Sequence, residues 1–223
     1  MKYIATLCAT ALVLASCGSF QAKKPFTVDI DAPRYAAGSA DLQVDKMLTG
    51  IKKTDVDLYY YPDDDAVCLE FRSGVFFSQF WSREGREAFI EALELYKADY
   101  EERNLLAKGG RKTKRAYGKV QGYIVWSTTR ILSEQAKGIS TIDIGYTFKD
   151  RMPFFSIMQE KAGNEIVRGD QKKVSPEVML YFTRAQAEVI ADLFNQEHLE
   201  GIEQTGGTKT EGLRGLLRDI FNI

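Results

Sequence analysis

The chain has 223 residues, with 30 lysines and arginines against 31 aspartates and glutamates, and a formal net charge of −1. This near-neutral balance argues against a nucleic-acid binder, which is usually basic overall or over one face. A hydrophobic fraction of 44% is ample for a globular core, and the length suits one large domain or two small ones.

The first residues have the layout of a signal peptide. Met1-Lys2 supplies one positive charge, and the stretch from Tyr3 to Ala15 is apolar apart from two threonines. That stretch is too short to span a bilayer as a permanent helix, which takes about 20 residues. We therefore expect residues 1–16 to be a signal peptide. The alternative is a buried N-terminal helix.

The apolar stretch ends in Leu14-Ala15-Ser16-Cys17, which resembles the lipobox of bacterial lipoproteins. The resemblance implies that a lipid is attached to the sulfur of Cys17 and that a peptidase cuts just before this residue. It implies an anchor on the extracytoplasmic side of a bacterial envelope, with residues 17–25 as a lipidated tether. Gly18 stands where the enterobacterial sorting rule looks for Asp, and its presence favours the outer membrane.

Cys68 is the thiol that would remain once Cys8 leaves with the signal peptide and Cys17 carries lipid. No internal disulfide is then expected. Cys68 lies in an apolar, strand-like run, where it is interpreted as a buried and inert side chain. The alternative is a reactive thiol.

Two stretches of the chain match each other. Residues 59–71 and 146–158 both read as a strand, a turn with Asp and a second strand, and residues 80–83 match 181–184. The offsets, 87 and 101, differ by 14 residues, which places an insertion within 162–176. We expect an α+β fold, an antiparallel sheet or sheets with packed helices, built from an internally duplicated unit of strands followed by a helix.

The duplicated unit organises the expected domains. The first half would cover residues 26–106, starting with a strand at 26–30, and the second half residues 117–200, joined by a basic linker at 107–116. This element order loosely resembles the repeats of PUR and Whirly-like proteins. Those families bind single-stranded nucleic acid, which a lipoprotein outside the cytoplasm would seldom meet, so only their architecture is carried over.

Two helices are the firmest elements. Ser82 is a suitable N-cap for a helix that we expect to run to about Asn104, with an apolar stripe that includes Phe89 and Tyr96. Thr183 with Gln186 predicts a capping box at the start of the second helix.

The sequence offers little for catalysis. His198, near the end of the second helix, is the one histidine, and the chain has no H-E-x-x-H, C-x-x-C, phosphate-loop or G-x-S-x-G motif. Asp63-Asp64-Asp65 after Pro62 favours a turn over a calcium loop, which alternates its ligands. We therefore assign no catalytic residue, metal or cofactor.

The one concentrated charge feature is the basic segment, Lys108–Arg115. It holds five basic residues and no acid; they are Lys108, Arg111, Lys112, Lys114 and Arg115. The first interpretation is a solvated loop between the halves. The second is an anion-binding site for lipid headgroups, a glycan or an acidic protein partner.

Aromatic residues make up 12% of the chain and occur in clusters such as 59–61, 76–77 and 154–155. Neighbouring rings point to opposite faces of a strand, so they require either a second covering layer or an exposed aromatic face for a glycan or partner. Residues 201–223 read as a linker and an amphipathic helix that docks on its own domain or, alternatively, in a partner's groove.

These features predict a lipid-anchored extracytoplasmic protein of the cell envelope that works by binding or as a structural component. The alternative is an envelope enzyme that uses Cys68 or a pair of carboxylates.

Overall fold

The computed structural model describes residues 25–46, 50–105, 114–128, 135–165 and 174–210. Within them the chain forms nine strands, three α-helices and one 3-10 turn. The strands are β1 (Arg34–Lys46), β2 (Gly50–Tyr61), β3 (Ala66–Ser73), β4 (Val75–Ser82), β5 (Lys114–Ser127), β6 (Ala136–Lys149), β7 (Met152–Gln159), β8 (Val178–Phe182) and β9 (Lys209–Thr210). The helices are α1 (Arg83–Glu101), α2 (Arg184–Phe194) and α3 (Gln196–Gln204), and the 3-10 turn is η1 (Pro62–Asp64). The protein is therefore an α+β protein, as the sequence predicts.

All neighbouring strands pair antiparallel, and the sheet closes on itself. The order runs from β2 through β8 to β1, and β1 pairs with β2 along its other edge. The closing contact is short and joins Gln43 to Tyr181 and Val44 to Leu180. Further along the same edge, β9 pairs with Arg34 and Tyr35. Closure protects edges that would otherwise be free to pair with another chain.

The element order is four strands followed by a helix, twice over. The first strand of each set carries a bulge, between Ala36 and Gly38 in β1 and between Ala116 and Gly118 in β5. Ser82 and Thr183 cap the two helices that follow the fourth strands. The matched residues 80–83 and 181–184 therefore occupy corresponding places in the fold.

The sequence alignment of the two hairpins is wrong by one residue. Tyr60 and Tyr146 both face the inner core, whereas Tyr59, which the alignment paired with Tyr146, packs on the opposite face of the sheet. A shift of one residue along a strand moves a side chain to the other face, so the alternation of burial decides the register.

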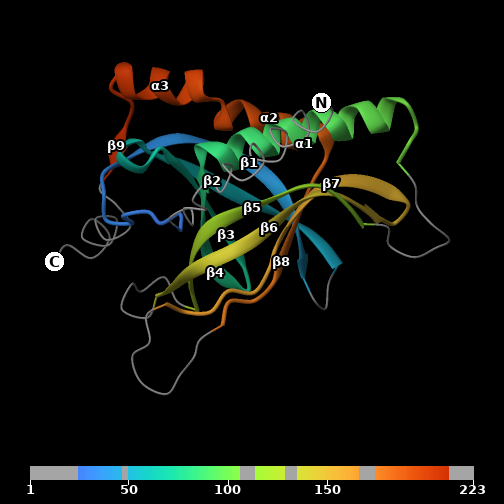
Figure 1. Ribbon diagram of the computed structural model, residues 1–223, viewed down its shortest axis with the longest axis horizontal. Coiled ribbons are helices and arrows are strands. Elements are labelled where there is room, and N and C mark those ends of the chain that lie inside the picture. Colours follow the sequence, from blue (N-terminus) through green and yellow to red (C-terminus); the bar gives the residue numbers. More distant parts are fainter. Residues whose placement is uncertain (1–24, 47–49, 106–113, 129–134, 166–173, 211–223) are drawn as a thin grey trace, which may run out of the picture.

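The helices form because each first turn is capped. The Ser82 side chain accepts a hydrogen bond from the backbone N–H of Gly85 at 3.2 Å. Thr183 and Gln186 form the expected capping box, with hydrogen bonds of 3.3 and 3.0 Å. All three helices lie on one side of the sheet (Figure 1).

Helix boundaries differ from the expected ones. Helix α1 ends at Glu101, three residues before Asn104, because the chain turns into a left-handed conformation at Arg103. The second helix ends at Phe194, and Asn195 caps a separate helix, α3, which contains His198. Residue 200, the expected end of the second half, therefore lies within α3.

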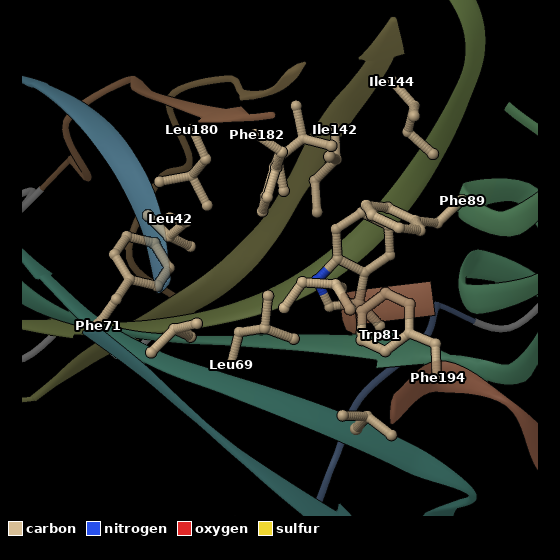
Figure 2. Packing of buried hydrophobic residues seen from close by; sticks show 14 of the residues in the cluster. Leu42, Leu69, Phe71, Trp81, Phe89, Ile142, Ile144, Leu180, Phe182 and Phe194 are labelled. Carbon is tan, nitrogen blue, oxygen red and sulfur yellow. The ribbon is translucent and has the colours of Figure 1, made fainter. Parts of the chain in front are cut away.

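The main core fills the space between the inner face of the closed sheet and the helices. Trp81 packs against Phe89 and Phe194 with ring centroids 5.9 and 5.4 Å apart, where strand β4 meets α1 and α2 (Figure 2). Figure 2 also shows Leu42, Leu180 and Phe182, from the two strands that close the sheet, in this cluster. Each fully buried apolar side chain of this size contributes roughly 1.5–3 kcal/mol.

A second layer covers the outer face of the sheet. Residues 25–33 run over it, and Val28 and Ala32 are buried there against Tyr61, Cys68 and Phe80. Their backbone is not a strand, so the strand expected at 26–30 is wrong. The backbone N–H of Asp29 donates to Asp64 Oδ2 at 2.9 Å, which fastens this segment to η1. This layer buries outward-pointing rings such as Tyr61 and Phe80.

Candidate binding site

An open cavity of about 460 Å³ lies where the end of α1, the hairpin between β6 and β7 and the start of α2 meet. We call it the aromatic cleft. Its lining residues are Tyr100, Glu101, Arg103, Leu105, Phe148, Pro153 and Arg184. Figure 1 shows the end of α1 on the same side of the molecule as the turn that joins β6 to β7. A volume of this size is typical of sites for small molecules.

The end of α1 supplies the first wall of the aromatic cleft. The helix stops in a Schellman arrangement: the N–H of Asn104 donates to the carbonyl of Asp99 at 2.8 Å, and that of Arg103 to the carbonyl of Tyr100 at 3.2 Å. Arg103 is left-handed, with φ of 59°. This sharp turn directs the following chain across the cleft to Leu105.

The second wall is the hairpin between β6 and β7. Lys149 pairs with Met152, which leaves Asp150 and Arg151 as a two-residue turn. Both have positive φ, 48° and 67°, as a type I′ turn requires. The turn places Phe148 and Pro153, which flank it, side by side at the cleft, and it leaves Met152 57% exposed nearby.

Helix α2 supplies the cationic side of the cleft. Arg184 is its first residue, fixed in direction by the capping box at Thr183. The Arg184 guanidinium carbon lies 4.2 Å from the centroid of the Tyr100 ring, a cation–π contact. The Arg184 guanidinium thus packs on one face of the exposed Tyr100 ring, and this contact orients both side chains in the absence of a ligand.

Two tyrosines, one buried and one half-buried, make hydrogen bonds that brace the elements around the cleft. Tyr96 is fully buried and donates from its hydroxyl to the carbonyl of Pro153 at 3.0 Å. Burial raises the pKa of Tyr96 to about 12, so this hydroxyl keeps its proton at neutral pH. Tyr117 donates to Asp99 Oδ2 at 2.7 Å. The hydrogen bond from Tyr96 thus joins α1 to the hairpin, so two walls of the cleft are linked directly.

The basic segment is only partly described. Cys17, Lys108, Arg111 and Lys112 lie outside the described residues. The backbone of Lys114 and Arg115 belongs to β5 and pairs with Thr147 and Tyr146, so the expected loop at 107–116 is wrong for residues 114–116. The ladder extends this far because β6 continues to Lys149. The connection between α1 and β5 thus leaves from Leu105 in the cleft and returns beside Phe148.

Cys68 is buried, as the sequence predicts. Its exposed fraction is 0%, beneath the outer layer, and burial raises the pKa of its thiol well above the usual value. Its neighbourhood also holds an internal ion pair. Arg34, with an exposed fraction of 0%, donates to Glu70 and lies 3.7 Å from the centroid of the Tyr59 ring. Burial lowers the pKa of Arg34, but the charge of Glu70, its hydrogen bond and the neighbouring Tyr61 and Cys68 together outweigh this effect, and the net shift of the pKa is upward.

Asp63-Asp64-Asp65 forms a turn, as the sequence predicts, and its last residue has a structural role. Asp65 accepts from Arg86 Nη2 at 2.9 Å and also pairs with Arg83. Arg86, 1% exposed, donates in addition to Gln196 Oε1 at 2.6 Å. This cluster ties η1 to α1 and α3.

The described residues give no sign of catalysis by His198, of a metal site or of a membrane-spanning helix. His198 is exposed on α3, with Nε2 3.4 Å from the carbonyl oxygen of Ala37. Within the described ranges, no three histidine, cysteine, aspartate or glutamate side chains are grouped so that they could hold a metal ion. No helix of the described chain is long and apolar enough to cross a membrane.

The cleft could not be predicted from the sequence, because its residues come from three separate stretches of the chain: the end of α1, the β6–β7 hairpin and the start of α2. The sequence patterns assigned no binding role to Tyr100, Arg103, Arg151 or Arg184. One local signal existed. Asp150-Arg151 sits between two strand-like runs at the place where Asp-Gly is the usual turn pair. An arginine at that position is unusual and could have been noticed.

The described residues together define an α+β protein with a closed antiparallel sheet, helices on one side of it and an open aromatic cleft bordered by arginines. The chain belongs to a family described as "Uncharacterised Treponema protein", whose model matches residues 22–201. All residues that line the cleft fall within the match, and Cys17 precedes it. No curated protein and no solved structure matches the chain.

Proposed function

We propose that this chain is a lipid-anchored binding protein of the bacterial cell envelope, and that the aromatic cleft is where it binds its ligand. The observation that carries the proposal is the cleft itself. It offers Tyr100, 39% exposed, and Phe148 beside two guanidinium groups, in a cavity of about 460 Å³. Exposed aromatic rings combined with a few oriented polar groups are characteristic of ligand sites.

The described chemistry supports binding over catalysis. An enzyme based on Cys68 needs a thiolate that a substrate can reach, and this thiol is fully buried with a raised pKa. His198 faces a backbone carbonyl of β1 rather than a nucleophile. The guanidinium groups of the cleft offer several N–H donors and no acceptor, so they suit recognition of a ligand rather than proton transfer.

The lipid anchor in this proposal rests on Leu14-Ala15-Ser16-Cys17. It is tested by labelling bacteria that express the wild type or Cys17→Ala with radioactive palmitate. We expect label in the wild type alone. Equal labelling of the two proteins would remove the anchor from the proposal while leaving the cleft to be tested separately.

We further propose that the fold arose by internal duplication of the four-strand-and-helix unit, the architecture that PUR and Whirly-like repeats also have. The bulges in β1 and β5, the inward Tyr60 and Tyr146, and the caps Ser82 and Thr183 support this. A crystal structure should superpose β1–α1 on β5–α2 with Ser82 on Thr183. A different path of the strands in the two halves would argue for chance similarity.

Binding at the cleft is tested with a chain from Gly18 to Ile223, which keeps every described residue. NMR spectra are recorded with a panel of anionic, neutral and cationic small molecules and short glycans. A ligand of the cleft should shift the amide signals of Leu105 and Phe148 and lose affinity for Phe148→Ala. Phe76→Ala, which truncates a half-buried ring on β4, is the matched control and should bind normally. If no compound shifts the cleft signals, the proposed function is wrong.

A further inference from the structure

We propose that the ligand of the aromatic cleft is an anion with an apolar body, and that Arg103, Arg151 and Arg184 bind its carboxylate or phosphate group. The inference rests on the proposed function and adds the chemical class of the ligand. The lining offers apolar surface from Tyr100, Leu105, Phe148 and Pro153 for the body. Among the lining side chains two guanidinium groups stand against the single carboxylate of Glu101, so the charge balance favours an anion.

The backbone supplies an independent argument. Four residues other than glycine have positive φ within the described chain: Asp65, Arg103, Asp150 and Arg151. Arg103 lines the aromatic cleft, and Asp150 and Arg151 form the turn of the hairpin that carries the lining residues Phe148 and Pro153. A left-handed backbone is unfavourable for a residue with a β-carbon, and such residues concentrate where function requires them.

Glycine is the usual residue at the positions of both left-handed arginines. Arg103 follows the helix cap in a Schellman motif, where glycine is the common residue. Arg151 is the second residue of a two-residue hairpin turn, where Asp-Gly is the preferred pair. In each case an arginine occupies a position where glycine would make the fold more stable. Stability therefore does not account for these residues, whereas recognition of an anion does.

The three arginines come from different elements; Arg103 and Arg184 line the cleft, and Arg151 lies in the turn of the hairpin that forms one wall. Arg103 follows α1, Arg151 lies in the turn between Phe148 and Pro153, and Arg184 begins α2. Guanidinium groups bind carboxylate and phosphate through paired hydrogen bonds, which fix the orientation of the anion. An apolar body attached to that anion then lies against Phe148 and Pro153, away from water.

The test uses stability and binding together, in the chain from Gly18 to Ile223. Arg103→Gly and Arg151→Gly should each raise the midpoint of thermal unfolding and, at the same time, weaken binding of octyl phosphate at least tenfold. A purely structural role would move the two measurements in the same direction. Arg72→Gln is the matched control, because Arg72 is also exposed and its guanidinium carbon lies 4.9 Å from the centroid of the Phe76 ring. Its binding should equal that of the wild type.

Four probes, measured by calorimetry below their micelle concentrations, define the ligand class. Octyl phosphate and octanoate should bind, while inorganic phosphate and octyl glucoside should bind at least tenfold more weakly, because each lacks one half of the ligand. Competition by vesicles containing anionic lipid would identify a membrane lipid as the source, and failure to compete would identify a free amphiphile.

Three results would overturn the inference: octyl glucoside binding as tightly as octyl phosphate, both glycine variants binding normally, or octyl phosphate not binding to the wild type. If octyl glucoside binds as tightly, or if both glycine variants bind normally, the proposed function still stands, provided that Phe148→Ala abolishes binding of the compound concerned. The proposed function itself is refuted only if, in addition, no compound of the wider panel shifts the amide signals of the cleft.

Discussion

Gln79 on β4 and Gln159 on β7 are 80 residues apart in the sequence, yet Gln79 Nε2 donates to Gln159 Oε1 at 2.9 Å in the buried interior of the closed sheet. Trp81 Nε1 donates in turn to Gln79 Oε1 at 3.0 Å. The three side chains thus form a polar chain within an apolar core. Gln159 Nε2 has no partner among the described groups.

Gln79→Leu should lower the free energy of unfolding by about 3 kcal/mol, because it strands the indole N–H of Trp81 and the amide of Gln159, at about 1–3 kcal/mol for each buried group. Gln159→Leu should lower it by only about 1 kcal/mol, because it removes an amide that is already partly unsatisfied. Urea denaturation of both variants and the double variant measures this. Equal losses of unfolding free energy in the two single variants would contradict the central position of Gln79 between Trp81 and Gln159.

Asp65→Asn should lower the free energy of unfolding by about 3 kcal/mol, because Arg86 is 1% exposed and would lose its charged partner. Asparagine tolerates the left-handed backbone at this residue, where φ is 46°, so the change isolates the charge. Asp63→Asn, in the same turn but exposed, is the control and should change stability by less than about 0.5 kcal/mol. A similar loss of unfolding free energy in both variants would show that the effect comes from the turn and not from the Asp65–Arg86 ion pair.

The Cys68 thiol should be inert in the folded protein. Its side chain is fully buried and burial raises its pKa, so the reactive thiolate is both scarce and shielded. A chain from Gly18 onward, which contains Cys68 as its one cysteine, is mixed with a thiol reagent with and without denaturant. Labelling should require denaturant. Rapid labelling without it would revive the enzyme alternative.

Stability should fall as the solution becomes alkaline. Burial raises the pKa of Tyr96 and of Tyr123 to about 12, above the usual tyrosine pKa of about 10. A tyrosine whose pKa is higher in the folded state holds its proton more tightly there, so its contribution is complete below about pH 10 and is lost as the pH rises towards 12. Tyr123→Phe should flatten this decline, measured by urea denaturation at a series of pH values. An unchanged slope would show that Tyr123 titrates freely.

The basic segment should bind anionic surfaces in a salt-dependent way. Five positive charges within eight residues attract an anionic membrane, and salt weakens the attraction because the screening length is about 8 Å at physiological ionic strength. Replacing Arg111, Lys112, Lys114 and Arg115 together by serine should abolish co-sedimentation with anionic vesicles. Binding by this variant, or none by the wild type at low salt, would leave the segment as a linker.

The sequence predicted the features that depend on local signals. The caps at Ser82 and Thr183, the turn at Asp63–Asp65 and the burial of Cys68 are all confirmed. Each follows from a short pattern whose physical meaning does not depend on distant residues.

Features that depend on long-range pairing escaped prediction. Closure of the sheet requires Val44 in β1 to pair with Leu180 in β8, and no local pattern in either strand indicates this pairing. The outer layer at residues 25–33 was misread as a strand, since a short apolar run looks alike in both. The cleft was missed because its residues come together only when the end of α1, the β6–β7 hairpin and the start of α2 meet in the folded chain.

The short contact between β1 and β8 has a kinetic consequence. β1 emerges first during synthesis, and the β8 residues that occupy its free edge emerge among the last of the sheet. Until Leu180 arrives, that edge of β1 offers unpaired backbone groups to any neighbouring strand. Proteins dominated by such distant pairings fold in milliseconds to seconds. We therefore expect the two ends of the sheet to join late in folding, and a delay there would leave an aggregation-prone chain.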